Sequence, residues 1–454
     1  MRKSALTALS LCLLAFPLRA QQEIKTGMGL YPLPEVAFDA DKGLQLGGLL
    51  TMYNFGDGHS YPNYVSDGYV ELAWFTKGSQ LFQAGYDVVE LLPGVRMSAS
   101  VYESKDRAMD FFGFNGYATK YDQQRVAQGQ DGGMDYGPNY KLSRLNVLGK
   151  VDLRGNITDR FKWELGLHYS FFDIDPIDFD NINKGKPDAS KYTESYTLYQ
   201  DFIDWGIISE QEAGGGSFLS FRAGLCYDSR DTESAPTKGI WAEAHIEAAP
   251  SIVASQGFYR YSMTWRQYFR ILDRNRLSLA LRANYQGCIG DDMPFYALPY
   301  MTVMGSGADK DGMGGYRTVR GIMRSRVVGR DMAEYNFEVR SRVWGRSMLG
   351  QNIAIGLSAF SDGAMVIRGR DMSYRPATLA GVASYARYQQ TVESICTKDR
   401  PHVAVGAGFR LIVNDNFILA AEYGVPVSHF VSSSNPIYNQ DGTGAFYINT
   451  EYLF

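Results

Sequence analysis

Cysteine and long apolar runs are scarce in this sequence. Only four of the 454 residues are cysteines, and three of them, Cys226, Cys288 and Cys396, follow the first twenty residues. An odd, sparse set excludes a disulfide framework, although it leaves open one pair between Cys288 and Cys396. After residue 20, no stretch reaches the roughly 18 consecutive apolar residues that a spanning helix needs. The sequence therefore predicts no transmembrane helix.

The first twenty residues have the pattern of a secretory signal. Arg2 and Lys3 precede an apolar run over 6–17, and a small residue, Ala20, ends the segment. We expect a signal peptide at 1–20 that is removed after Ala20. Its removal changes the formal charge from −4 to −7, with 42 basic residues left against 49 acidic ones. This balance gives no reason to expect nucleic acid as a partner.

The composition of the remaining chain favours β-structure. The sequence holds 31 tyrosines, 25 phenylalanines and 48 glycines, and aromatic residues are enriched in strands. Two classes of secreted protein fit this mixture. One is a soluble sandwich or propeller, and the other is a transmembrane β-barrel, in which lipid-facing and lumen-facing side chains alternate.

Alternation of apolar and charged residues favours the barrel. In "YNFEVRSRVW" (335–344), apolar residues alternate with Glu338, Arg340 and Arg342, which fits lipid outside and water inside. We predict an all-β fold, a 16-stranded antiparallel transmembrane β-barrel over 34–454, after a short periplasmic segment at 21–33. The expected strands are 34–38, 44–55, 69–77, 80–90, 94–104, 143–154, 161–172, 218–228, 239–248, 257–270, 275–287, 331–344, 351–363, 402–413, 416–425 and 443–454.

The lengths of the connections indicate the orientation. With both termini in the periplasm, the short connections fall on the periplasmic side. The long ones, 105–142, 173–217, 288–330, 364–401 and 426–442, then fall outside, as in bacterial outer-membrane barrels. One of these, 173–217, carries four aspartates: Asp173, Asp175, Asp178 and Asp180. A solvated acidic loop is the favoured interpretation, and binding of a hard cation such as calcium is the alternative.

No catalytic or cofactor pattern stands out. The five histidines stand in no pattern typical of barrel lipases or proteases, and no Gly-x-Ser-x-Gly nucleophile motif occurs. We expect no enzymatic activity, no cofactor and no bound metal.

Three segments in the second half carry the strongest motifs. "GLCYDSRDTESAPTKGIWAEA" (224–244) holds an expected periplasmic turn with Asp228, Arg230, Asp231, Pro236 and Gly239. "GGYRTVRGIMRSRVVGRDMAEYNFEVR" (314–340) contains Val319-Arg320-Gly321, and "AFSDGAMV" (359–366) contains Asp362. With "FFGFNGY" (111–117) and the terminal strand "FYINTEYLF" (446–454), these segments resemble the BamA/TamA superfamily, or bacterial surface antigen family, of outer-membrane assembly and translocation barrels.

The resemblance implies a role for the arginine-rich outer loop. In such barrels this loop folds back into the lumen, where the arginine of its Val-Arg-Gly tip packs against the inner wall. Carried over, Val319, Arg320 and Gly321 form a lumen latch with Glu338 and Asp362. A desolvated guanidinium must be paired with carboxylates, which agrees with this assignment. The resemblance also implies a targeting signal on the last strand, at Ile448, Tyr452 and Phe454.

The resemblance further implies a function at the outer membrane of a Gram-negative bacterium. We expect a barrel that assists the insertion or translocation of polypeptides or lipids, with a weak seam between the first strand, "PEVAF" (34–38), and the last. The segment 21–33 is too short for a polypeptide-transport-associated (POTRA) domain, which family members use to receive clients. Expected partners are outer-membrane lipids and lipopolysaccharide, client outer-membrane proteins, POTRA-bearing or lipoprotein subunits, and a second copy in a homodimer. The alternative is a passive plugged pore or a structural surface protein.

Overall fold

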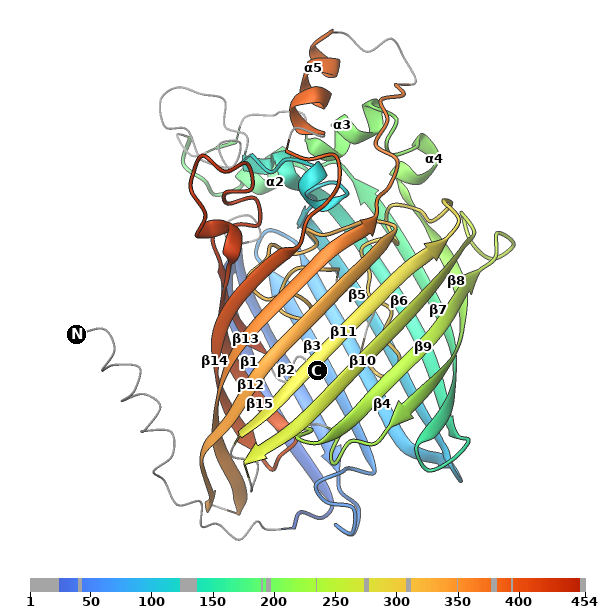
Figure 1. Ribbon diagram of the computed structural model, residues 1–454, viewed down its shortest axis with the longest axis vertical. Helices are drawn as coiled ribbons and strands as arrows, with labels where there is room; N and C mark the ends of the chain where they lie inside the picture. Colours follow the sequence, from blue (N-terminus) through green and yellow to red (C-terminus); the bar gives the residue numbers. More distant parts are fainter. Residues whose placement is uncertain are drawn as a thin grey trace, which may run out of the picture.

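The protein folds as a single curled sheet. The computed structural model describes residues 24–39, 43–122, 137–188, 191–192, 197–233, 235–272, 277–307, 312–348, 350–376, 382–392 and 395–449. Its sixteen strands are hydrogen bonded in chain order, and every neighbouring pair is antiparallel. Figure 1 shows the sheet rolled into a barrel. The predicted all-β, 16-stranded fold is confirmed, whereas the expected signal peptide at 1–20 lies outside the described residues.

The strand bounds follow the expected order along the chain. They are β1 (Met28–Asp39), β2 (Gly43–Asn54), β3 (Ser66–Phe75), β4 (Gln80–Leu92), β5 (Val95–Asp110), β6 (Lys141–Asn156), β7 (Phe161–Asp175), β8 (Gly215–Asp228), β9 (Gly239–Ala249), β10 (Phe258–Leu272), β11 (Leu277–Ile289), β12 (Asp331–Met348), β13 (Gln351–Arg368), β14 (His402–Val413), β15 (Phe417–Pro426) and β16 (Ala445–Asn449).

Short helices lie in the long connections, and the labelled α-helices gather at one end of the barrel, the helical end (Figure 1). The described helices are η1 (Gly116–Ala118), η3 (Gly137–Tyr140), α2 (Phe179–Asn183), α3 (Leu198–Asp204), α4 (Glu210–Ala213), α5 (Val382–Thr391) and η6 (Val427–His429). In the acidic loop, Asp178 caps α2 by accepting a hydrogen bond from the backbone N–H of Asn181. Among the described residues, no helix is long and apolar enough to cross a membrane.

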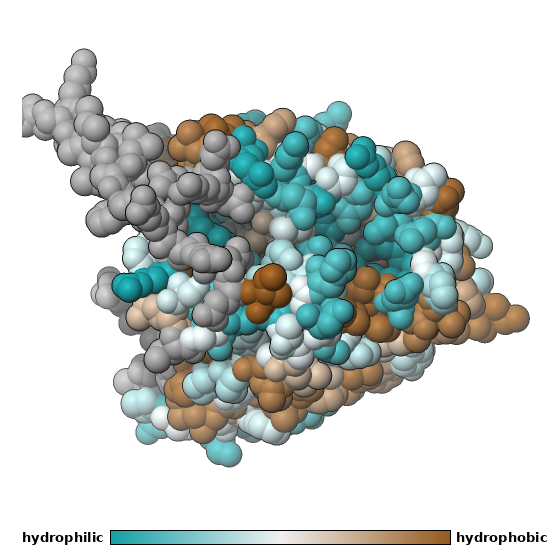
Figure 2. Space-filling view, turned by 90° about the horizontal axis from the view of Figure 1, so that it is seen from below, coloured by the Kyte–Doolittle hydropathy of each residue, from teal (hydrophilic) through white to brown (hydrophobic). Residues whose placement is uncertain are grey.

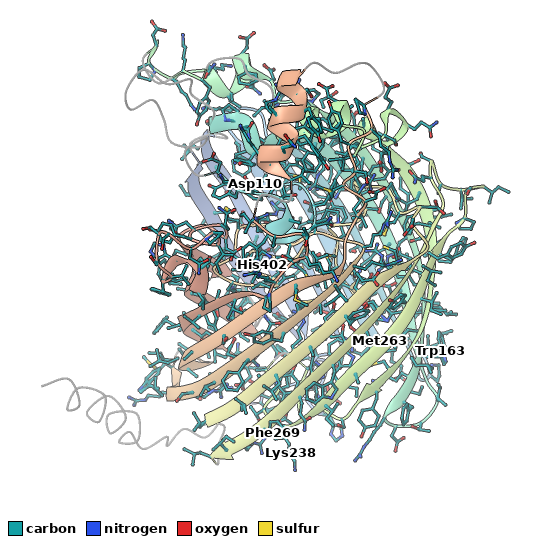
Figure 3. The ribbon with its side chains drawn as sticks, turned by 45° about the horizontal axis from the view of Figure 1, so that its top comes forward. Asp110, Trp163, Lys238, Met263, Phe269 and His402 are labelled. Atoms are coloured by element: carbon teal, nitrogen blue, oxygen red, sulfur yellow. The ribbon has the colours of Figure 1, made fainter. Side chains whose placement is uncertain are left out.

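The wall of the barrel is apolar outside and polar inside. On β7, Leu165, Leu167 and Tyr169 are exposed, whereas the alternate residues Glu164 and His168 are buried. Figure 3 shows Trp163 and Met263 on the outer wall. This arrangement is the reverse of a soluble protein and matches a lipid-facing surface around a polar lumen.

The first strand begins earlier in the chain than the sequence predicted. β1 pairs with β2 in unbroken register from Met28↔Asn54 to Asp39↔Gly43, so it starts at Met28 rather than at 34. Residues 28–33, expected in a periplasmic segment, therefore belong to the wall. Pro32 and Pro34 concealed this start in the sequence, since proline is tolerated only where its missing N–H faces away from a neighbouring strand.

An aromatic cap closes the helical end of the barrel. Side chains from the segments 111–114, 198–208 and 293–300 form one buried cluster, with Phe202 and Trp205 fully buried. Cys288 lies in this cluster. It is a free thiol, as are Cys226 and Cys396, so the pairing left open between Cys288 and Cys396 is not formed.

Candidate functional site

The arginine-rich segment before β12, residues 313–330, packs against the inner wall; we call it the latch segment. Asn336 of β12 donates its amide N–H to the carbonyl of Thr318 at 2.7 Å. Arg282 of β11 reaches the carbonyl of Arg317 at 3.5 Å. Both strand residues alternate with exposed neighbours on the lipid-facing side, such as Tyr335 and Phe337. The segment around Val319 therefore lies inside the barrel.

Val319 supplies the apolar anchor of this segment. Its side chain is fully buried in a cluster with Met313, Ile322 and Val327 of the same segment and with Ala404 of β14. Full burial of a valine contributes roughly 1.5–3 kcal/mol. This contact holds the tip of the segment against the wall beside Arg320.

Arg320 is fully buried and carries several hydrogen bonds to carboxylates. Its Nε donates to Asp362 Oδ2 at 2.8 Å, and its Nη2 to Asp362 Oδ1 at 3.1 Å. Its Nη1 donates to Glu338 Oε2 at 2.9 Å. The guanidinium carbon also lies 3.6 Å from the centre of the Phe360 ring. The structure thus brings together the three charged residues that the sequence analysis selected.

Three further charged residues belong to this network, and the sequence analysis assigned none of them to it. Arg340 of β12 donates to Glu338 Oε1 at 3.0 Å. Glu422 of β15 accepts from Arg320 Nη1 at 2.7 Å. Arg410 of β14 lies 2.8 Å from Glu338 and 2.7 Å from Glu422. For Glu422 and Arg410, the only available signal was a single acid or arginine at an inward position of an otherwise apolar strand. The latch thereby contacts β12, β13, β14 and β15.

Gly321 lets the segment approach the last strands closely. Its φ of +92° is unfavourable for other residues, and a Cβ there would lie 2.7 Å from the carbonyl carbon of Gly424. The N–H of Gly321 donates to the hydroxyl of Tyr447 on β16 at 3.0 Å. The glycine is therefore required both by its backbone conformation and by the packing, and it ties the latch to β16.

The other arginines of the segment have different surroundings. Arg326 is buried and donates to the carbonyls of Gly116, Thr119 and Gln440, which fastens the segment to the η1 region and to the loop after η6 rather than to acids. Arg330 pairs with the exposed Asp291 at 2.8 Å.

The expected turn motif forms a compact hydrogen-bonded structure between β8 and β9. Arg230 holds both oxygens of Asp228 at 3.0 Å. Asp231 accepts from the Thr237 hydroxyl at 2.7 Å and from Arg270 at 2.6 Å. Partial burial alone would raise the pKa of Asp231, but the hydrogen bonds from Thr237 and Lys238 lower it below its ordinary value.

The other residues predicted for this turn and for the terminal strand are Pro236, Gly239, Ile448, Tyr452 and Phe454. Pro236 is buried in the turn, and Gly239 begins β9 with a φ of +108°. Ile448 is an exposed residue of β16, whereas Tyr452 and Phe454 lie outside the described residues.

A polar cavity of about 360 Å³ lies in the lumen between the latch segment and the end away from the helices. Arg96, Arg154, Arg266, Trp241 and Glu243 contribute to its lining. Figure 2 shows that end, with hydrophilic side chains gathered within it and hydrophobic ones mainly at the edge. This part of the lumen is thus lined by charged side chains, and the cap closes the other end of the barrel.

Comparison with known proteins decides the family. The Omp85 superfamily domain matches residues 91–449. The chain belongs to the Omp85 superfamily. The predicted BamA/TamA resemblance, which concerns barrels of this superfamily, is therefore confirmed. Omp85 barrels are proteins of the Gram-negative outer membrane, so membership supports that location.

Two solved structures share the fold of this Omp85 barrel. BamA from Haemophilus ducreyi lacking POTRA domains 1–3 is 13% identical, with a TM-score of 0.50, over 98% of this chain and 77% of that one. CdiB from Escherichia coli is 11% identical, also with a TM-score of 0.50, over 96% of this chain and 68% of that one. A comparison with curated protein sequences finds no match.

Proposed function

We propose that this Omp85 barrel assists the insertion or translocation of polypeptides at the outer membrane, using the seam between β1 and β16. The observation that carries the proposal is the backbone edge of β1 turned away from β2, an edge with which no described residue pairs. Gly27 directs its N–H and C=O toward β2, to Gly56 and Phe55. Because backbone groups alternate between the two sides of a strand, the even-numbered residues of β1 direct theirs to the edge away from β2.

Pro32 and Pro34 therefore stand on that edge and remove two N–H donors from its middle. No described residue of β16 is paired with β1 in the sheet, which runs from β1 to β16 without a ladder between its ends. An edge with unpaired carbonyls can template an incoming strand. Because two donors are missing, pairing between this edge of β1 and β16 would be weaker than a full ladder. Weak pairing favours replacement of β16 by a client strand.

The other side of the seam is held by the latch. Over the described residues, β16 pairs with β15 through five residue pairs, from Ala420↔Asn449 to Gly424↔Ala445. Tyr447 and Asn449 of β16 contact Gly321 and Glu422, respectively. The latch therefore steadies β16 from inside the barrel, and no described residue pairs with the other edge of β16.

Side chains close the barrel where the ladder ends. The Tyr31 hydroxyl accepts from the Asn414 amide at 2.9 Å, and its ring stacks on Phe417 at 5.1 Å. Such contacts join β1 to the β14–β15 turn without backbone pairing. A seam held by side chains and a latch can open at lower cost than one held by a full ladder.

Depletion of the protein tests the function. The outer-membrane proteome is compared before and after depletion in the native host. A fall in a defined set of barrels or lipoproteins, with steady transcripts, supports the proposal. An unchanged proteome with altered lipid asymmetry points instead to lipids as the cargo, and an unchanged proteome with altered solute permeability points to the pore alternative.

A pair of double variants tests the seam itself. Pro32→Thr with Pro34→Thr adds two N–H donors to the edge of β1 away from β2, so we expect slower client assembly by a folded barrel. Leu30→Thr with Val36→Thr is the matched control, because it places threonines on the same exposed face without adding donors. Equal effects of the two double variants would contradict the role of the edge.

The alternative proposal is a plugged pore or a structural surface protein, which the aromatic cap favours. In either case we propose a non-enzymatic role. Client outer-membrane proteins, POTRA-bearing or lipoprotein subunits, and lipids with lipopolysaccharide are the proposed partners. Single-channel conductance separates the two functions, since a passive pore conducts independently of any client.

A further inference from the structure

Three buried side chains converge on the lumen wall away from the latch. They are Glu164 of β7 and Glu243 and His245 of β9, and one ligand atom of each lies within 4.8 Å of the others. Glu164 is opposite Gly224 of β8, and Gly224 is opposite His245. The three positions therefore share one inward-facing patch of neighbouring strands.

Gly224 leaves the space in which these side chains meet. A Cβ at this position would lie 2.5 Å from the Ala244 carbonyl oxygen and 3.0 Å from the Cβ of His245. Across this gap, His245 Nδ1 and Glu164 Oε2 are 3.8 Å apart. This separation is too long for a direct hydrogen bond but suits two atoms that share a ligand between them.

The polar atoms that face the gap have no hydrogen-bond partner among the described residues. They are Glu164 Oε2, Glu243 Oε2 and both ring nitrogens of His245, and all four are buried. A buried polar atom left unsatisfied costs about 1–3 kcal/mol. By contrast, His168 on the same wall has one ring nitrogen, Nε2, bonded to Asp152 Oδ1 at 2.6 Å, whereas neither ring nitrogen of His245 has a partner among the described residues.

We propose that Glu164, Glu243 and His245 bind a divalent transition-metal ion, for which Zn²⁺ is the best fit. An imidazole nitrogen with carboxylate oxygens is a common zinc donor set, whereas Ca²⁺ and Mg²⁺ prefer oxygen alone. The charge is also compatible, because two carboxylates face the gap and, among the described residues, only Glu164 forms an ion pair with an arginine or lysine, Arg154 at 2.5 Å. Arg266 acts electrostatically on Glu243 without pairing with it.

The surroundings supply access and a second layer of support. Glu243 lines the lumen cavity, so an ion can reach the site from the polar interior. Arg154 Nε donates to Glu164 Oε1 at 2.7 Å, which orients the carboxylate and leaves Oε2 directed at the gap. Partners of this kind commonly fix the ligands of a metal site. Three protein ligands leave a position for water or another group.

Cobalt titration tests the site. The barrel is purified in detergent without a histidine tag, treated with a chelator and titrated with Co²⁺, while visible absorption and equilibrium dialysis record binding. We expect one equivalent that Zn²⁺ displaces and Ca²⁺ does not. His245→Gln and Glu243→Gln should each weaken binding by roughly ten-fold or more, with heat-modifiable migration on gels reporting that the variants are folded.

The matched control is His168→Gln, which removes a buried lumen histidine outside the cluster and should leave binding intact. Absence of Co²⁺ binding by the wild-type barrel would overturn the proposal, whatever the variants do. Equal affinity of the wild type and His245→Gln, or displacement of Co²⁺ by Ca²⁺, would overturn it as well.

Discussion

Replacement of Arg320 by methionine should be the most damaging single change in the lumen latch. The change removes the hydrogen bonds to Asp362, Glu338 and Glu422, all of which are buried. Arg410 still holds the two glutamates, but Asp362 loses both bonds from the guanidinium. Removal of one partner of a buried ion pair costs about 3–5 kcal/mol, and we expect Arg320→Met to lower the free energy of unfolding by that amount.

Urea unfolding in lipid vesicles, followed by tryptophan fluorescence, measures this loss. Arg330→Met is the control in the same segment, because its partner Asp291 is 65% exposed and a solvent-exposed pair contributes about 0–1 kcal/mol. Adding Asp362→Asn to Arg320→Met should cost less than the sum of the single changes, since the two sites are coupled. An Arg320→Met barrel within about 1 kcal/mol of the Arg330→Met control would refute the latch.

Three further predictions follow from the same contacts. Gly321→Ala should destabilise the barrel by about 1–3 kcal/mol, whereas Gly350→Ala, also at positive φ but with open space around it, should cost less; equal costs in urea titrations would contradict the close approach. Because the pKa of Asp231 is lowered in the fold, its carboxylate stabilises the protein above its unfolded pKa, and this stabilisation is lost as the pH falls through the folded pKa. Asp231→Asn should therefore make the free energy of unfolding depend less on pH on the acid side. An unchanged pH dependence would contradict a stabilising role of the Asp231 carboxylate in the turn. Trp205→Ala, at a fully buried position, should weaken the aromatic cap by about 3–5 kcal/mol; hydrogen exchange should rise in the cap and not in the strands, so a uniform rise would count against a separate cap.

Much of the barrel could be predicted because each strand carries its own pattern in a short stretch of sequence. Alternation of lipid-facing and lumen-facing residues recurs every two positions, so segments such as 161–172 and 335–344 indicate strands directly. The start of β1 could not be predicted in this way. Pro32 and Pro34 are compatible with β1 because they stand on its edge away from β2, an edge with which no described residue pairs, and the position of that edge is a property of the whole sheet.

The latch could be predicted in part, and for a different reason. Arg320, Glu338 and Asp362 came from a family motif together with their inward position. Glu422 lies 102 residues from Arg320 along the chain, and no spacing rule brings the two together. The proposed metal site was missed for the same reason, because its ligands lie on β7 and β9 and meet only across a glycine of β8.

Site-specific photo-crosslinking in the native host tests the central claim most directly. A photoreactive side chain replaces Val36, which is exposed on the seam strand β1, or Val101, which is exposed on β5 away from the seam. Insertion at the seam predicts polypeptide adducts from position 36 and not from position 101. Adducts from both positions, or from neither while the host assembles its outer membrane normally, would contradict it.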